Sequence, residues 1–224
     1  MAPARSHRFT RLVDDVAACR ACAAVDHVHV LAPGNGPLDA RVLFVAEAVG
    51  RRGGAITGVP LTRDESGRRF ARFLALAAIE RHEAFITNAV LCNPLDAAGR
   101  NRAPSPREVA NCRAFLVRTL DVVRAPVVVA LGRVALESLR AITPHDAVLA
   151  RDVATARDWR GRTLVPMYHP SRQSTLHRPD AEQEEDWRRL GALLRARLPA
   201  PIAAPTMTPH EPGCPALHVV HRPH

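Results

Sequence analysis

Four short apolar runs, rich in β-branched residues, stand out along the chain. They cover residues 41–46, 84–88, 126–131 and 163–168. Largely continuous apolar runs of this length are typical of strands that are buried on both faces of a sheet. We therefore predict four strands, each followed by a turn or a helix.

Helical patterns lie between these runs. Apolar residues recur three and four positions apart, with arginines on the opposite face, at Phe70, Phe73, Leu74 and Ala77. This spacing predicts an amphipathic helix. Ser105 and Glu108 form a capping box around Pro106, which predicts the start of a second helix. Two more helices are predicted over residues 134–141 and 181–198.

This alternation of strands and helices predicts an α/β fold, a three-layer αβα sandwich around a central four-stranded, mostly parallel sheet. In such sheets, ligands bind beyond the carboxyl ends of the strands. Residues 46–50, Asn88, Gly132 and His169 each lie at or just past a predicted strand end. We expect these residues to line one crevice.

The last part of the chain differs in composition from the rest. Residues 199–224 hold seven of the 19 prolines and four of the 11 histidines, with no repeating period, which favours a disordered tail. Residues 1–198 are long enough for a single domain with a buried core. The chain has no run of 18 apolar residues, and residues 1–9 lack the apolar core of a signal peptide. We therefore expect a cytoplasmic protein without a membrane segment, and a monomer.

The charge is strongly basic and comes from one residue type. The formal net charge is +9, and all 31 basic residues are arginine, so the chain contains no lysine. The absence of lysine excludes a lysine Schiff base, a phosphate-loop lysine and a lysine general base. The excess of arginine has two explanations, a surface that binds phosphates or the codon usage of a GC-rich genome.

The cysteines are the first candidates for a metal centre. Cys19 and Cys22 form a C-x2-C pair, Cys92 directly follows a predicted strand, and Cys112 lies on the apolar face of a predicted helix. Four thiolates can hold zinc or an iron–sulfur cluster, and their spacing does not separate the two. Small core residues are the alternative, above all for Cys112. Cys214 lies in the tail, and we expect no role for it.

Taken in order, the motifs resemble the iron–sulfur branch of the uracil-DNA glycosylase superfamily, most of all its family 5 and next its family 4. The resemblance covers residues 19–194 and rests on the C-x2-C pair, Ala46-Glu47-Ala48-Val49-Gly50, residues 57–67, Thr87-Asn88, Cys92, Asn101-Arg102-Ala103-Pro104, Cys112, Val129-Ala130-Leu131-Gly132 and His169-Pro170-Ser171. No single motif is specific for this family, but the order of the motifs and their places at strand ends, taken together, are specific for it.

This resemblance implies a monofunctional DNA glycosylase that flips uracil out of DNA and excises it hydrolytically, which starts base excision repair. Other deaminated bases, such as hypoxanthine or xanthine, are further candidate substrates. A 4Fe–4S cluster with a mainly structural role is implied at Cys19, Cys22, Cys92 and Cys112.

The resemblance also implies the residues of the site. Asp64 stands where the family has the carboxylate that positions water, Asn88 where an amide contacts the base edge, and His169 where the leaving base is supported. Substrate contacts are implied at Glu47, Ala48, Gly50, Leu61, Asn88, Gly132 and Ser171.

The chemistry of these side chains agrees with that reaction. Breaking an N-glycosidic bond leaves positive charge on the sugar and negative charge on the base. Asp64 can stabilise the sugar, and His169 can donate to the base oxygen. The amide of Asn88 offers the donors and the acceptor that suit an imide edge. Each of these residues also has a structural alternative, as a helix cap for Asp64, as turn residues for Asn88 and His169, and as a partner of loop amides for Glu47.

DNA contacts are expected around this site. Flanking phosphates would be bound by arginines such as Arg51, Arg52 and Arg172, and by amides of the helix that starts after Gly132. Residues 172–177 form a candidate loop that wedges into the duplex, with Leu176 as its apolar tip; a solvated connection is the alternative.

Departures from the family pattern leave a second function open. Ala46 and Val49 replace the glycine and the proline of the first motif, and Leu61 replaces an aromatic residue that stacks on the flipped base. The alternative is a catalytically impaired iron–sulfur DNA-binding protein of the same fold. A Rossmann-like nucleotide-binding enzyme is disfavoured, because no G-x-G-x-x-G follows the first strand.

Overall fold

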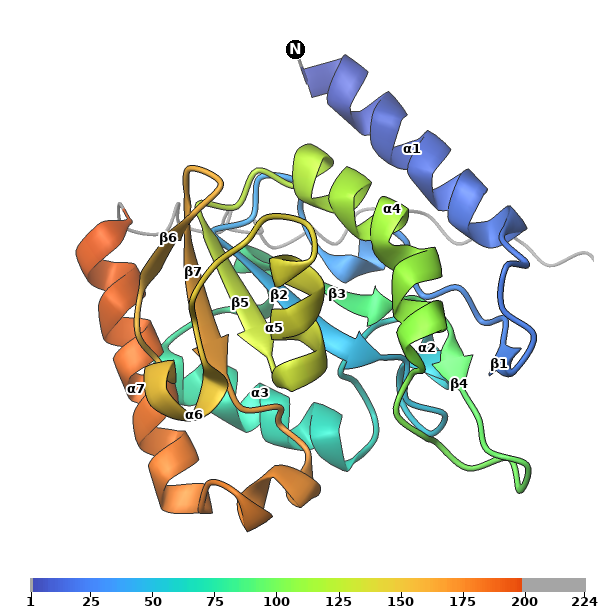
Figure 1. Cartoon of the computed structure of the whole chain (residues 1–224). Helices are drawn as coiled ribbons and strands as arrows, with labels where there is room; N and C mark the ends of the chain where they lie inside the picture. The colour runs from blue at the N-terminus through green and yellow to red at the C-terminus, as the bar shows by residue number, and fades with distance from the viewer. Residues whose placement is uncertain (1, 199–224) are drawn as a thin grey trace, which may run out of the picture.

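The computed structural model describes residues 2–198 and has a central five-stranded sheet (Figure 1). The strand order is β3-β2-β5-β7-β6, with β2 over Val42–Ala48, β3 over Ala84–Val90, β5 over Val127–Leu131, β6 over Arg157–Trp159 and β7 over Arg162–Met167. Strands β3, β2, β5 and β7 are parallel to one another. The predicted α/β fold with a mostly parallel sheet is thus confirmed.

The number of strands was predicted wrongly, because the sheet has five strands and not four. The additional strand, β6, lies at the edge of the sheet and pairs antiparallel with β7. A two-residue turn joins them, and both of its residues, Arg160 and Gly161, have positive φ angles, as in the tight turns of hairpins. Strand β6 is only three residues long and carries two polar residues, so it has no apolar run that a sequence pattern could reveal.

Helices cover both faces of the sheet. Helices α3 (Glu65–Ala77) and α7 (Asp180–Arg197) pack on one face, and α1 (Ala2–Ala18), α4 (Pro106–Val122) and α5 (Arg133–Arg140) pack on the other (Figure 1). The buried side chains of β2 alternate between the two cores: Leu43 and Val45 face α4 and α5, whereas Val42, Phe44 and Ala46 face α3 and α7. This alternation follows from the two-residue period of a strand.

Helix α1 was missed by the sequence analysis. Its buried residues Phe9, Leu12 and Val16 recur at helical spacing, so the pattern was present although it covers only one narrow stripe. These side chains join the core beneath α4, and Figure 1 shows α1 lying along α4. The helix ends at Ala18, directly before Cys19.

Short elements complete the described residues. They are β1 (Val25–Asp26), η1 (Pro33–Asn35), α2 (Gly54–Thr57), η2 (Arg81–Glu83), β4 (Asn93–Pro94), α6 (Leu149–Asp152) and η3 (Arg172–Leu176). Strands β1 and β4 pair with each other in a small antiparallel sheet, so the segment after Cys22 lies beside the segment after Cys92. In residues 2–198, no helix combines the length and the apolar character needed to cross a membrane. The predicted tail, residues 199–224, lies outside the described residues.

An aromatic cluster joins α3, α7 and the sheet. The ring of Trp187 stacks on Phe73 at a centroid distance of 5.3 Å and on Phe44 at 5.7 Å. The helices approach closely one turn further on, where a Cβ atom on Gly191 would lie less than 3.0 Å from the carbonyl oxygen of Ala77. Glycine at position 191 therefore allows the contact between α3 and α7.

We predict that Gly191→Ala destabilises the protein, although alanine is the better helix former by about 1 kcal/mol. The added methyl group collides with backbone, which cannot move aside as a side chain would. We expect the free energy of unfolding to fall by ~1–3 kcal/mol in urea titrations. Ala192→Gly, at an exposed position of the same helix, measures helix propensity alone. A stabilised Gly191→Ala variant would show that the two helices are not in close contact here.

Candidate active site

A pocket with a volume of about 690 Å³ opens at the carboxyl edge of the sheet. It contains every residue for which a catalytic or substrate-binding role was predicted: Glu47, Ala48, Gly50, Leu61, Asp64, Asn88, Gly132, His169 and Ser171. These residues come from the ends of β2, β3, β5 and β7 and from the turn before α3. The expected crevice is therefore present, and it brings all of these residues together. Of the residues expected around it, Ala46 does not line the pocket, because its side chain is buried in the core that faces α3 and α7.

Asp64 is both a helix cap and a pocket residue. Its Oδ1 accepts a hydrogen bond of 2.9 Å from the backbone N–H of Gly67, which caps α3. Its Oδ2 lies against the backbone of Gly50 and Gly53, where a Cβ atom on either residue would approach within 3.0 Å. The cap fixes the orientation of the carboxylate, and the glycines let it pack directly on the first motif.

The turn that leads to Asp64 is strained. Leu61 and Arg63 have φ angles of 51° and 67°, in the left-handed region that costs about 1–3 kcal/mol for residues other than glycine. The hydroxyl groups of Thr57 and Thr62 lie 2.6 Å apart, and Thr62 also donates to the carbonyl of Val59. These bonds hold the turn in a conformation that places Leu61 in the pocket.

Asn88 presents an unpaired amide. It lies near the end of β3 with only 3% of its surface exposed, and its Nδ2 has no hydrogen-bond partner among the described residues. A buried N–H without a partner costs free energy that a bound carbonyl group would recover. The amide is therefore available to a ligand in the pocket.

His169 follows β7 and is also without a partner. Neither ring nitrogen is hydrogen-bonded within residues 2–198, and the backbone of Gly132 lies close to its Cβ. Enclosure by the surrounding protein lowers the pKa of His169 to about 4. The imidazole is consequently neutral at pH 7, with one N–H donor and one acceptor.

Glu47 is the second acidic residue of the pocket. Burial raises the pKa of its carboxyl group, and the nearby guanidinium of Arg133 opposes this shift. Arg133 is the first residue of α5 and lines the same pocket. The pair places a carboxyl group and a cation at the wall that β2 and α5 form.

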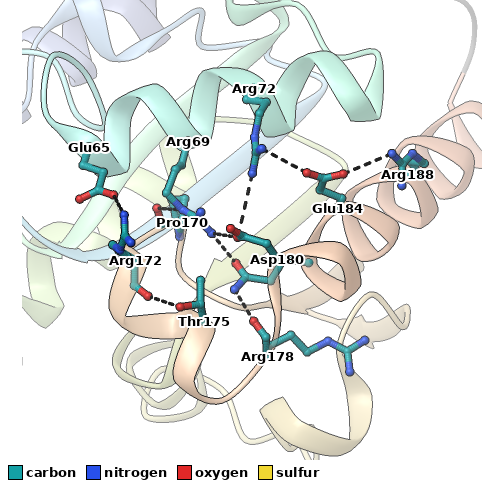
Figure 2. Close-up of polar contacts among 11 residues, drawn as sticks. Glu65, Arg69, Arg72, Pro170, Arg172, Thr175, Arg178, Asp180, Glu184 and Arg188 are labelled. Atoms are coloured by element: carbon teal, nitrogen blue, oxygen red, sulfur yellow. Dashed lines mark hydrogen bonds and ion pairs between the residues drawn. The ribbon is translucent and has the colours of Figure 1, made fainter.

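Arg69 anchors the segment that carries His169 (Figure 2). From α3 its Nε donates to the carbonyl of Pro170 at 3.1 Å, and its Nη2 donates to Asp180 at 2.6 Å and to Gln183 at 3.5 Å. Its side chain is only 11% exposed. One guanidinium thus ties α3, the residue after His169 and the start of α7 together.

The segment after His169 is fixed at its other end too, while its middle stays exposed. Arg178 forms two hydrogen bonds with Asp186, of 2.8 and 2.7 Å. Between these anchors, Arg172 contacts Glu65 at 3.6 Å across exposed surface (Figure 2), and such exposed ion pairs are weak. Leu176, the predicted apolar tip, is 80% exposed. The sequence placed it in a loop, and the structure places it in the short helix η3.

A second hollow, of about 890 Å³, adjoins the pocket and is lined by arginines. It shares Asp64, Ser66 and Asn101 with the pocket. Its cationic residues are Arg51, Arg52, Arg63, Arg68 and Arg100. No carboxylate of the described residues forms a salt bridge with Arg51, Arg52, Arg63 or Arg68; Arg100 pairs with Asp96 at 2.9 Å. The hollow is therefore a cationic surface next to the predicted catalytic residues.

The four predicted metal-binding cysteines are near one another. Cys92 and Cys112 are buried, and Cys19 and Cys22 are partly buried. Burial, with smaller contributions from the thiols of Cys112, Cys19 and Cys22, raises the pKa of the Cys92 thiol to about 12. The thiols thus lie close enough to repel one another as thiolates, and a bound cationic group would remove that repulsion.

Backbone donors and histidines surround these sulfurs. The backbone N–H of His29 donates to Cys92, and that of Leu91 donates to Cys112, bonds that favour a thiolate. Within residues 2–198, His27, His29 and Cys92 are the one set of three potential ligand atoms that lie within 4.8 Å of one another. The donor set and its polar surroundings fit a metal centre better than an apolar core.

Several residues of the site were missed by the sequence analysis. Tyr168 supplies an aromatic ring to the pocket, and Asn93 and Arg102 line its wall. Asn93 is fully buried, and its Nδ2 donates to the carbonyl of Val49 at 2.6 Å and to Asn101 at 3.0 Å. The sequence offered one signal for two of them: Tyr168 directly precedes His169, and Asn93 directly follows Cys92.

We predict that the imidazole of His169 shows no titration near pH 6.5. Because its pKa is lowered to about 4, it stays neutral from pH 8 to pH 5 and takes up a proton only below that range. Unfolded chains bind this proton earlier, so His169 lowers the stability of the fold as the pH falls from about 6.5 towards 4. NMR titration of the histidine Cε1–H signals, with His169→Gln to assign the resonance, measures the pKa. A midpoint near 6.5 would contradict the enclosure of the ring.

Comparisons with known proteins agree with this site. The family model described as "Uracil DNA glycosylase superfamily" matches residues 33–191. The type-4 uracil-DNA glycosylase of Archaeoglobus fulgidus is 30% identical over 195 residues, which cover 84% of this chain and 94% of that protein. A type-4 enzyme of Thermotoga maritima is 31% identical over 68% of this chain and 76% of its own length, and a type-5 enzyme of Thermus thermophilus is 33% identical over 64% and 70%. The resemblance seen in the motifs is thereby confirmed, and the chain belongs to the uracil-DNA glycosylase superfamily.

Proposed function

We propose that this protein is a monofunctional DNA glycosylase that flips uracil out of DNA and hydrolyses its N-glycosidic bond. One observation carries the proposal: the carboxylate of Asp64, the unpaired amide of Asn88 and the unpaired imidazole of His169 line a single pocket. Relatives named uracil-DNA glycosylase support the choice of base. Hypoxanthine and xanthine, which also carry an N–H beside a carbonyl, are further candidate bases.

Asp64 acts at the sugar. As the glycosidic bond breaks, positive charge develops on the sugar, as in glycoside hydrolysis. A carboxylate held by the Gly67 N–H and packed on the backbone of Gly50 is preorganised to stabilise that charge and to orient the attacking water. The helix cap thus contributes to catalysis by fixing the carboxylate in place.

Asn88 and His169 act at the base. Negative charge develops on the oxygen of the departing base, and fixed hydrogen-bond donors stabilise it. His169, neutral because its pKa is about 4, donates an N–H without giving up a proton. The amide of Asn88 contacts the imide edge, where a ring N–H lies between two carbonyls.

Leu61 and Tyr168 shape the base pocket. Leu61 lines it without the aromatic face that the family resemblance implies at this position, and Tyr168 supplies a ring to the same pocket. Base–aromatic stacking contributes ~1–3 kcal/mol per base. We infer that Tyr168 provides part of the contact that Leu61 lacks.

Flipping requires the gap in the duplex to be filled. The glycosidic bond is shielded in the stack, so the nucleotide has to be extruded. Leu176, exposed on a segment anchored at both ends, suits an apolar wedge. The reaction then ends at an abasic site, because a chain without lysine has no lysine amine to attack the sugar. We therefore expect no strand cleavage.

A 4Fe–4S cluster is the cofactor that the four cysteines fit best. Four cysteine thiolates can hold such a cluster, and the family resemblance implies it at these four positions. The thiols of Cys112, Cys19 and Cys22 lie near enough to contribute to the raised pKa of Cys92, so one group could bind all four. When bound, the cluster would hold the N-terminal segment, the loop after β3 and helix α4 together rather than take part in the reaction.

We predict that purified protein releases uracil from an oligonucleotide and that Asp64→Asn lowers the single-turnover rate about 10²- to 10⁴-fold. Asparagine keeps the helix cap, so folding and DNA affinity should change little. Asp158→Asn, at an exposed position of the edge strand β6, is the control and should keep the wild-type rate. Equal rates for Asp64→Asn and wild type would remove Asp64 from its role. Release of neither uracil, hypoxanthine nor xanthine by cluster-loaded protein would favour the catalytically impaired DNA-binding alternative.

The arginine hollow generates a prediction for DNA binding. Arg51 and Arg52 are exposed in this hollow, and their guanidinium groups form no hydrogen bond or salt bridge within residues 2–198. If they contact phosphates, Arg51→Gln and Arg52→Gln each lower the slope of log K against log salt by about 0.9 on duplex DNA. Fluorescence anisotropy with an abasic duplex at several salt concentrations measures this slope. Arg195→Gln, at an exposed position of α7, should leave it unchanged, and equal slopes for all variants would exclude the hollow as a phosphate site.

A further inference from the structure

Arg102 uses all five of its N–H donors. Its Nε donates to the carbonyl of Leu95 at 3.0 Å, and its Nη1 donates to the carbonyl of Ala103 at 3.0 Å and to Glu108 at 2.8 Å. Its Nη2 donates to the carbonyl of Ala24 at 2.8 Å and to the other carboxylate oxygen of Glu108 at 2.6 Å. A guanidinium has five donors in a rigid fork, so this side chain is fully satisfied by protein groups.

The partners of Arg102 lie on the three segments that carry the four cysteines. Ala24 is two residues after Cys22, and Leu95 is three residues after Cys92. Glu108 precedes Cys112 by four residues in α4, so both side chains lie on the same face of that helix. One side chain therefore joins the segment after α1, the loop after β3 and the helix α4.

Glu108 is a buried carboxylate whose charge is fully compensated. Only 5% of the residue is exposed, and the guanidinium of Arg102 lowers the pKa of its carboxyl group to about 2, with further bonds from Ser105. The negative charge of Glu108 contributes to the raised pKa of the Cys112 thiol, because it disfavours a thiolate nearby. The ion pair with Arg102 offsets that charge beside the cysteines.

The same segment reaches the substrate pocket. Asn101, the residue before Arg102, accepts hydrogen bonds from Asn93 and from the backbone N–H of Arg51. Asn93 in turn donates to the carbonyl of Val49, next to the glycine on which Asp64 packs. The cysteine-bearing loop and the wall of the pocket are thus parts of one hydrogen-bonded unit.

We propose that Arg102 is the positioning residue that assembles the four-cysteine site and retains its cluster. The proposal rests on the cluster proposed above and adds the group that holds its ligand segments in place. Arginine is required, because lysine presents three donors on a compact ammonium group and cannot form the fork with Glu108 while also reaching three backbone carbonyls.

The test compares Arg102→Lys with wild type and with Arg113→Lys. Arg113 is exposed beside Cys112 on α4, and it forms no side-chain hydrogen bond or salt bridge within residues 2–198, so its variant controls for a lysine near the site. Iron and sulfide content and the loss of visible absorbance in excess chelator are measured on the full chain. We expect Arg102→Lys to lose the cluster about 10- to 100-fold faster than wild type, the usual range for groups that orient metal ligands, and Arg113→Lys to match wild type.

A second variant and a folding control keep the outcomes distinct. Glu108→Gln keeps its shape and its bond to Ser105 but loses the charge-assisted pair, and its rate of cluster loss should lie between those of wild type and Arg102→Lys. Far-UV circular dichroism shows whether each variant folds. If Arg102→Lys does not fold, the proposal is tested by Glu108→Gln alone: cluster loss faster than in wild type supports it, and an equal rate overturns it. Equal rates for all variants would overturn the role of Arg102 and leave the cluster intact. Wild-type protein without iron and sulfide would overturn the cluster itself, and the role of Arg102 with it.

Discussion

The parallel pairing of β3, β2, β5 and β7 is the constraint on which the site depends. In a parallel sheet all carboxyl ends meet at one edge, and the register of this sheet sets Ala46 opposite Asn88 and Leu131 opposite Met167. Residues 47–50, Asn88, Gly132 and His169, far apart in sequence, are therefore forced around one pocket. The antiparallel strand β6 extends the sheet at the far edge and contributes no residue to that pocket.

The residues that hold the segments around the pocket differ in hydrogen bonding from the residues inside it. Arg102 and Arg69 donate hydrogen bonds to carbonyl and carboxylate groups of several segments. Inside the pocket, by contrast, the Asn88 amide and the His169 ring have no partner among the described residues. An unpaired buried polar group is destabilising, and the Asn88 amide is such a group, whereas His169 is partly exposed to the pocket. The hydrogen bonds of Arg102 and Arg69 stabilise the surrounding segments and keep both groups in fixed positions before a base is bound.

Local sequence signals predicted most of the sheet and the ends of several helices. Four apolar runs gave the parallel strands, and Ser105 with Glu108 gave the start of α4. Strand β6 and the pair β1–β4 are too short to form a periodic pattern. The site residues that were missed owe their roles to distant partners: Arg69 binds Pro170, 101 residues away, and Arg102 binds Ala24, 78 residues away. Such pairings are set by the folded chain and leave no mark in local spacing.

The arginine excess acquires a structural explanation that composition could not supply. Besides Arg69 and Arg102, Arg81 donates to carbonyls around η1, and Arg162 donates to the carbonyls of Leu120 and Val123 at the end of α4. Burial lowers the pKa of both Arg81 and Arg162, yet a guanidinium remains charged and keeps every donor. Lysine, which loses its proton more readily when buried and lacks the planar fork, could not replace them. In the second hollow, by contrast, the guanidinium groups of Arg51 and Arg52 have no partner among the described residues and offer their charge to a ligand. A chain without lysine thus uses one residue type for both tasks.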